Sequence, residues 1–173
     1  MDEDYGQRLE IALGELLQRR TRHGLYAELV AGIGRGLDIR SYPVLSGLAR
    51  CGNLTAVQLG TEIGLDRSGT SRHATRLEEG GLLVRRPDPY DGRATLLCLT
   101  EDGERVIALL RDRLAAILTE RLGTWPAAEA ESFVAGMERF VREQRTDPAP
   151  DESGEPPDAS PGGAGRAPHR PGS

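Results

Sequence analysis

The chain has 173 residues, which is long enough for one ordinary domain with a sizeable hydrophobic core. Its formal net charge of −5 argues against a basic coat that binds nucleic acid indiscriminately, and its two cysteines form no CxxC motif, so neither a metal site nor a disulfide framework is indicated. The acidic start does not resemble a signal peptide and no apolar run is long enough to span a bilayer, so we expect a cytoplasmic protein that does not contact membranes and keeps its thiols reduced.

The N-terminal part of the chain carries leucine, valine and isoleucine residues at helical spacing. This pattern predicts one long amphipathic helix over residues 5–36, with Gly34 and Gly36 placed to mark its end. The polar side of this helix carries four residues that either line a cleft or form a solvated face: Arg19, Arg20, His23 and Tyr26.

Two short helices are predicted next. A proline is tolerated best in the first turn of a helix, so Pro43 indicates a short helix over residues 42–50. Thr55 and Gln58 fit the capping box Thr-x-x-Gln, which opens a second helix over residues 56–63. A glycine turn and a third helix follow, and the three together form a helix-turn-helix arrangement.

The third helix covers about residues 67–79 and holds three arginines, one histidine and no acid between residues 67 and 77. On a helical wheel Thr70, Ala74 and Leu77 share one small, apolar face. The polar residues on the opposite face and its shoulders are Ser68, Ser71, Arg72, Thr75 and Arg76. A recognition helix has this layout, because its apolar stripe docks on the scaffold while hydroxyl and guanidinium groups face outward.

A β-hairpin is predicted after the double glycine that ends this helix. Residues 82–84 begin an apolar strand, and residues 94–99 return as its partner. The Pro- and Gly-containing segment 87–92 between them reads as a loop that cannot continue a strand. A helix that can enter a DNA groove, followed by a hairpin with Arg93 at a basic tip, is a winged helix. The expected fold is mainly α with a small β-hairpin wing, in the α+β class.

The C-terminal part of the chain begins with Thr100, which is placed to cap a helix that runs to about Leu122. The apolar stripe of this helix is too wide to be covered by a small winged helix alone. A last helix follows Pro126 and carries Phe133 and its apolar neighbours. Residues 146–173 are rich in proline, glycine, serine and acid, and have too little apolar content to offset the entropy of ordering, so we predict a disordered tail.

The run from Ser41 to Gly103 resembles the MarR family of bacterial regulators. Several motifs carry this resemblance in order along the chain: the Pro-Val-Leu opening, the Leu-Thr capping box, the Leu-Asp-Arg-Ser start of the third helix and the Ser-Arg within it, the Asp91-x-Arg93 wing, and Leu97-x-Leu99-Thr100-Glu101-x-Gly103. The ordered set is far more specific than any one of its parts.

The resemblance implies an obligate homodimer with a helix-turn-helix region flanked by long dimerisation helices. Residues 1–37 and 101–145 would form the dimerisation region, and residues 38–100 the DNA-binding winged helix. A two-fold dimer would place two recognition helices in successive major grooves, about 34 Å apart, so the expected partner is double-stranded DNA with a palindromic operator. Many relatives are repressors whose grip on DNA loosens when a small aromatic acidic or phenolic ligand enters a cleft between the two regions.

The resemblance also implies roles for single residues. Arg72 matches the arginine of the recognition helix and would contact base edges or phosphate. Arg93 matches the wing arginine that enters the minor groove, and Asp91 would pair with it and aim it, unless the two form only a loop ion pair. Other candidates for DNA contact are Arg67, Ser68, Ser71 and Arg76, although hydroxyls at a helix start also serve as caps. Arg85 and Arg86 would either reach phosphate or make the outer face of their strand polar.

The sequence offers little support for functions other than DNA binding. The sequence has no Gly-rich phosphate loop, no paired nucleophile and base and no metal cluster, so we predict no enzyme activity, no catalytic residues, no metal and no cofactor. A winged helix can also serve as a protein–protein interaction module, or act as an activator that needs no ligand. An interaction module would not need both an outward Arg72 and a basic wing tip at Arg93.

Overall fold

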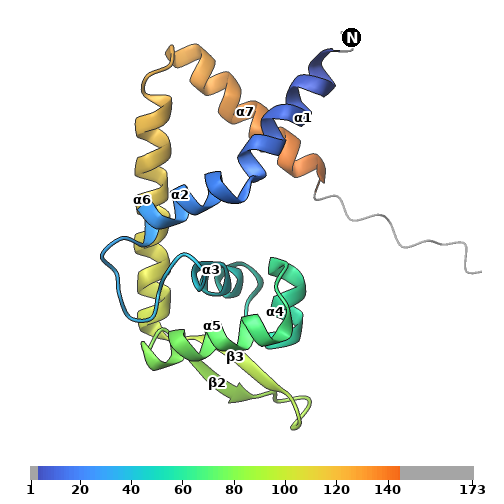
Figure 1. Ribbon diagram of the computed structural model, residues 1–173, viewed down its shortest axis with the longest axis vertical. Helices are drawn as coiled ribbons and strands as arrows, with labels where there is room; N and C mark the ends of the chain where they lie inside the picture. The colour runs from blue at the N-terminus through green and yellow to red at the C-terminus, as the bar shows by residue number, and fades with distance from the viewer. Residues whose placement is uncertain (1–3, 145–173) are drawn as a thin grey trace, which may run out of the picture. The chain divides into compact units, whose positions relative to one another are not determined.

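The computed structural model describes residues 4–144, and the predicted disordered tail, residues 146–173, lies outside this range. The chain divides into two compact units, Met1–Thr124 and Trp125–Ser173, which are described separately. Figure 1 traces the elements of both. Among the residues that the structure describes, no helix is both long and apolar enough to cross a membrane.

The single helix predicted over residues 5–36 is wrong, because the structure has two shorter helices, α1 (Asp4–Leu17) and α2 (Arg19–Val30). They are separated at Gln18, whose ψ of 141° is that of extended backbone. Beyond Val30 the chain has positive φ at Gly32, Gly34, Arg35 and Gly36, a left-handed conformation that ends a right-handed helix and that glycine adopts without strain.

The end of α2 is held by an arginine from a distant helix. The Arg113 guanidinium donates hydrogen bonds to the carbonyl oxygens of Leu29, at 2.7 Å, and Ala31, at 2.8 Å. Carbonyl groups at the C-terminal end of a helix have no partner inside the helix. Arg113 therefore provides the hydrogen-bond donors that these carbonyl oxygens would otherwise lack.

The helix-turn-helix is confirmed. It consists of α3 (Tyr42–Cys51), α4 (Ala56–Ile63) and α5 (Arg67–Glu79). The capping box is also present, because the Thr55 hydroxyl accepts from the Gln58 amide while the Gln58 side chain accepts from the Thr55 amide. A short strand that the sequence did not indicate, β1 (Leu54–Thr55), precedes α4.

The three strands form an antiparallel sheet in the order β1-β3-β2, with β2 at Leu83–Pro87 and β3 at Thr95–Leu99. The expectation that Pro87 begins the loop is wrong by one residue, since Pro87 pairs with Thr95. Proline is compatible with this position because β2 is an edge strand and needs no donor on its open side. Cys98 is buried in β3, as a small hydrophobic residue would be.

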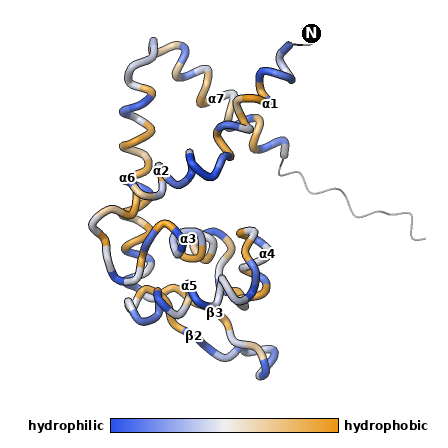
Figure 2. The backbone as a smooth tube through the Cα atoms, in the orientation of Figure 1, coloured by the Kyte–Doolittle hydropathy of each residue, from blue (hydrophilic) through white to orange (hydrophobic). Residues whose placement is uncertain are grey.

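The helix α6 (Glu101–Leu122) begins as predicted, with the Thr100 hydroxyl accepting from the Gly103 amide at 3.0 Å. The core of the first unit draws leucines from α2 to α6 and from β2 and β3, and the fully buried ones include Leu29, Leu45, Leu59, Leu77, Leu82, Leu97 and Leu110. The second unit holds α7 (Ala127–Gln144), where Trp125 packs edge-on against Phe133. Figure 2 shows hydrophobic residues recurring along α1, α6 and α7.

Candidate nucleic-acid interface and adjacent cleft

Helix α5 presents the side chains predicted to bind DNA. Its start is capped by Asp66, whose carboxylate accepts from the Gly69 amide at 2.5 Å, and its predicted docking face of Thr70, Ala74 and Leu77 is buried. The predicted contact residues are Arg67, Ser68, Arg72 and Arg76, which are exposed, and Ser71, which is half-buried. In Figure 1 α5 lies across the β2–β3 hairpin at one end of the first unit.

Arg72 is free to meet a partner, whereas Ser68 is partly engaged. The Arg72 guanidinium makes no hydrogen bond or ion pair with any residue that the structure describes. The Ser68 hydroxyl donates to the Asp66 carboxylate at 3.1 Å. The hydrogen bond from the Gly69 amide, followed by that from Ser68, lowers the pKa of Asp66. The alternative that a hydroxyl at the helix start serves the cap therefore describes Ser68 in this structure.

Arg76 points back to the scaffold. Its guanidinium forms an ion pair with Asp38 at 2.8 Å, and Asp38 lies in the segment between α2 and α3. Burial raises the pKa of Asp38, but hydrogen bonds from the amides of Ser41 and Arg40 and the charge of Arg76 outweigh it, and the net shift is downward. The carboxylate is thus held in its charged form opposite Arg76.

Arg85 on β2 is also tied down. Its guanidinium pairs with Glu78 and donates to the Thr75 hydroxyl at 3.0 Å, and both partners lie on α5. Of the two roles left open for Arg85, the structure shows neither a free phosphate contact nor a solvated strand face, but a brace between the hairpin and α5. Arg86, the next residue, is exposed.

The wing tip is built by two successive turns closed by aspartates. The Asp88 carboxylate accepts from the amides of Tyr90, at 2.8 Å, and Asp91, at 3.3 Å. The Asp91 carboxylate then accepts from the Arg93 amide at 3.0 Å. Turns of this kind fix the backbone through a short acidic side chain.

Asp91 therefore contacts Arg93 through the backbone amide of Arg93. Within residues 4–144 no ion pair joins the Asp91 and Arg93 side chains, so the expected pairing of the two is not present. The guanidinium of Arg93 is exposed and carries no bond to a described residue. Sequence reasoning also passed over Tyr90, which is 98% exposed at the same tip.

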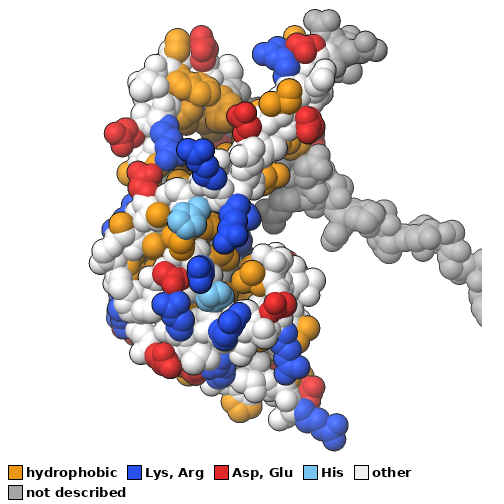
Figure 3. Space-filling view, viewed as in Figure 1, with side chains coloured by type: hydrophobic (Ala, Val, Ile, Leu, Met, Phe, Trp, Pro, Cys, Tyr) orange, Lys and Arg blue, Asp and Glu red, His pale blue; other side chains and the backbone are white. Residues whose placement is uncertain are grey.

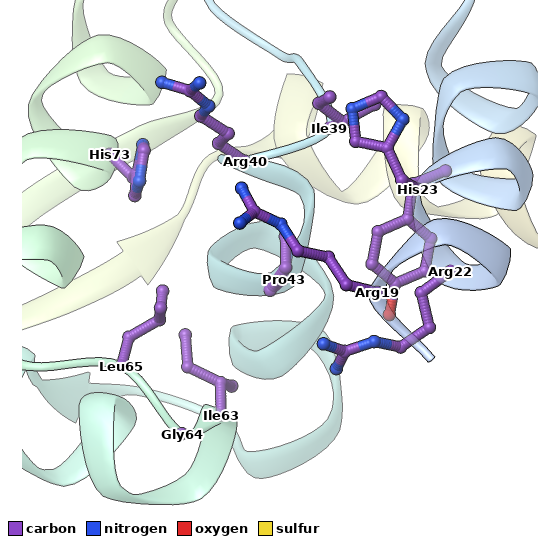
Figure 4. A pocket seen from close by; sticks show the side chains of 11 residues that line it. Arg19, Arg22, His23, Ile39, Arg40, Pro43, Ile63, Gly64, Leu65 and His73 are labelled. Atoms are coloured by element: carbon purple, nitrogen blue, oxygen red, sulfur yellow. The ribbon is translucent and has the colours of Figure 1, made fainter. Parts of the chain in front are cut away.

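A cleft of about 370 Å³ lies between α2 and the helix-turn-helix. Of the two alternatives for the polar residues of α2, Arg19, His23 and Tyr26 follow the first, because they line this cleft. Arg20 does not line it. Arg22 of α2 lines the cleft as well, and so do Arg40 and His73, which no local pattern could place there because they come from the segment before α3 and from α5. Figure 3 shows arginine and histidine side chains gathered on this face, and Figure 4 shows the lining residues from close by.

His73 faces this cleft from α5. Its Nδ1 atom is buried and finds no hydrogen-bond partner among the residues that the structure describes. Burial lowers the pKa of the imidazole, nearby guanidinium groups including that of Arg40 lower it further, and the carboxylate of Asp38 opposes them. The sequence leaves packing beside the core and DNA contact equally open for His73, and its buried Nδ1 favours packing.

Comparison with known proteins places these features in context. A family model described as the MarR family matches residues 35–94. A Bacillus subtilis protein described as the uncharacterized HTH-type transcriptional regulator YxaD is 30% identical over 104 residues, which are 60% of this chain and 73% of the relative.

Solved structures of MarR family proteins have a similar fold. A MarR family protein from Bacillus stearothermophilus superimposes with a TM-score of 0.68 at 22% identity, over 83% of this chain and 98% of that one, which shows the likeness of fold. The PcaV transcriptional regulator from Streptomyces coelicolor, solved in complex with its natural ligand, is similar at 29% identity and a TM-score of 0.50, over 81% of this chain and 91% of that one.

Proposed function

This chain belongs to the MarR family of DNA-binding transcription regulators, and from that premise we propose that it is a homodimeric repressor released from its operator by a small ligand. The observation that carries the proposal is the pair of unpartnered guanidinium groups, Arg72 on α5 and Arg93 at the wing tip. Arg72 and Arg93 belong to neighbouring elements, because α5 packs beside the β2–β3 hairpin.

Arg72 is proposed to contact base edges in the major groove, where a bidentate guanine contact contributes about 1–3 kcal/mol of discrimination. Arg93 is proposed to enter the adjacent minor groove, whose negative potential attracts guanidinium groups. Arg67 and the half-buried Ser71 lie one turn apart on α5, and they are proposed to supply phosphate contacts. Ser68 is hydrogen-bonded to Asp66 and Arg76 is paired with Asp38, so we propose that these two residues mainly hold α5 in position rather than contact DNA.

A second copy of the chain explains why so much apolar surface is exposed. Large apolar patches on a soluble protein indicate an interaction surface. Exposed apolar side chains recur on α1, α6 and α7: Leu9, Ile11, Leu16, Leu17, Leu109, Leu118, Phe133, Val134, Met137, Phe140 and Val141. We therefore assign residues 1–37 and 101–145 to dimerisation and residues 38–100 to DNA binding. The two-fold symmetry of such a dimer calls for a palindromic operator.

The cleft between α2 and the helix-turn-helix is the proposed ligand site. It opens between a helix assigned to dimerisation and α5, so a ligand there can change how α5 is presented to DNA. The volume of about 370 Å³ suits a small aromatic compound. A solved neighbour, PcaV, was captured with its natural ligand, which supports a ligand-responsive regulator.

The test is to select DNA fragments from the genome with the purified protein and titrate the selected duplex at several salt concentrations. We expect a dimer by sedimentation, one palindromic motif, and an affinity that falls steeply with salt as counterions are released. Arg72→Ala should bind at least tenfold more weakly, while Arg8→Ala, which removes the same charge from α1, should bind as the parent does. A monomer that selects no sequence at low salt would overturn the proposal.

A further inference from the structure

The cleft beside α2 has an unbalanced charge. Arg19, Arg22 and Arg40 line it, and within the described part of the chain none of their guanidinium groups forms an ion pair or a side-chain hydrogen bond. The described lining residues include no aspartate or glutamate. Guanidinium groups stay charged in proteins, so three of them around one cleft repel one another until an anion joins them.

These cations stand at two ends of the cleft. Arg19 and Arg22 are three residues apart on α2, so they lie on the same side of that helix, and His23 follows at the next position on this side. Arg40 comes from the segment before α3 and His73 from α5, and the charge of Arg40 acts on the imidazole. Figure 4 shows Arg40 and His73 on the side of α5 and Arg22 on the side of α2, while the side chain of Arg19 starts on α2 and extends towards Pro43.

Between the two ends the surface is apolar. Ile39, Pro43, Ile63 and Leu65 form this part of the lining, and Figure 4 shows Pro43 between the two charged ends. Tyr26 lines the α2 side, where its ring packs edge-on against Tyr42 with centroids 4.7 Å apart. A ring or short hydrocarbon body fits such a middle section, since apolar surface favours apolar contact.

We infer that this cleft takes a small molecule with two anionic groups joined by an apolar body, one group held by Arg19 and Arg22 and the other by Arg40 and His73. A ligand with one anionic group would leave one end of the cleft without a counter-charge. At the α5 end, the unpartnered Nδ1 of His73 gains a hydrogen-bond partner, since a protonated Nδ1 donates to an anionic oxygen. This inference rests on the proposed function, because it names the ligand class of the regulatory cleft.

The place of His73 gives the ligand a direct route to DNA binding. His73 follows Arg72 on the same helix, so a ligand that holds His73 acts on the segment that presents Arg72. A two-ended ligand also links α2 to α5, and this link exists only when both ends are occupied. Binding of a dianion therefore fixes the distance between the two helices.

The test compares two probes of the same shape and size, terephthalate with two carboxylates and 4-carbamoylbenzoate with one, by calorimetric titration of the full-length protein without DNA. We expect terephthalate to bind at least tenfold more tightly. His73→Gln and Arg40→Gln should each reduce this preference to about threefold or less, while Arg20→Gln, which changes an arginine of α2 outside the cleft, should keep it. Equal affinity for the two probes, or a preference that survives in both His73→Gln and Arg40→Gln, would overturn the inference.

The DNA titration separates failure of this inference from failure of the proposed function. A parent protein that binds its palindrome but does not prefer the dianion disproves the ligand class and leaves the repressor proposal standing. A protein that prefers the dianion but binds no DNA supports the ligand class and disproves the repressor. Circular dichroism of each variant shows that a lost preference does not come from unfolding.

Discussion

Arg76 and Asp38 form an ion pair at 2.8 Å that fastens α5 to the segment preceding α3. The pair connects residues 38 positions apart in the chain, and both side chains are partly exposed. An arginine predicted from its place on the helical wheel to meet DNA is therefore used to hold α5 in place. Its contribution to DNA binding is expected to come through the position of α5.

Arg76→Ala is expected to lower the free energy of unfolding by about 0.5–1 kcal/mol, the range for a partly exposed ion pair, and to weaken DNA binding less than Arg72→Ala does. Denaturant titration and DNA titration of the same samples measure both effects. Asp38→Ala removes the other partner and should lower stability at least as much. An Arg76→Ala protein with unchanged stability and DNA affinity as low as that of Arg72→Ala would show a direct DNA contact instead.

Lowering the pH should weaken the ion pair between Arg76 and Asp38. The pKa of Asp38 is lowered in the native state, so the unfolded chain binds more protons than the native one as the pH falls past the ordinary range of an aspartate, near 4. The stabilisation is present above that range and is lost as the pH falls through the native pKa. Asp38→Asn cannot titrate, so its stability should fall less between pH 6 and pH 3 than that of the parent, as measured by denaturant titration.

At the wing tip, two variants of Asp91 separate a backbone role from an ion pair. Asp91→Asn removes the negative charge but keeps an oxygen that can accept from the Arg93 amide, whereas Asp91→Ala removes both. We expect Asp91→Asn to bind DNA at least as well as the parent and Asp91→Ala to bind several-fold more weakly than Asp91→Asn. Equal losses in both variants would mean that the charge of Asp91, rather than the turn, aims Arg93.

The two exposed side chains of the tip should differ in salt dependence. Arg93→Ala is expected to weaken binding, keep the preferred half-sites and reduce the slope of log affinity against log salt by about one, as expected for the loss of one cation near phosphate. Tyr90→Ala removes an uncharged group, so any loss of affinity should leave that slope unchanged. A slope unchanged in Arg93→Ala would place its guanidinium away from the phosphates.

A backbone contact between Gly36 and α5 should tolerate no side chain. A Cβ added at Gly36 would meet the carbonyl oxygen of Arg76, and the residue also has a φ of +74°. Gly36→Ala is therefore expected to cost about 2 kcal/mol or more of stability. Gly34→Ala is the matched control, because its φ is also positive but nothing stands within 4 Å, and it should cost only about 1 kcal/mol. Similar losses in both would indicate backbone strain alone.

Local signals made much of the fold predictable. The helix-turn-helix was predictable because its signals are local. The proline of α3, the capping box of Thr55 and the glycines between the helices each set a helix start or end within a few residues. The break at Gln18 was missed because neither proline nor glycine marks it. β1 was missed because two residues are too short to show a strand pattern.

The site was predictable only in part, because tertiary contacts decide what each arginine does. Arg72 and Arg93 were identified from helical position and motif, and both remain without a described partner in the structure. The roles of Arg76 and Arg85 depend on Asp38 and Glu78, and no local pattern shows that such residues will meet. The cleft is harder still, since its charged residues come from three separate segments.

The bonds from Arg113 to the carbonyl oxygens of Leu29 and Ala31 anchor the C-terminal end of α2. Leu29 is buried at the anchored end, while Arg19 lies at the other, about 15 Å away at 1.5 Å per residue. Any tilt of α2 about this anchored end would move Arg19 more than Leu29. Small tilts can thus widen or narrow the mouth of the cleft without disturbing the packing around Leu29.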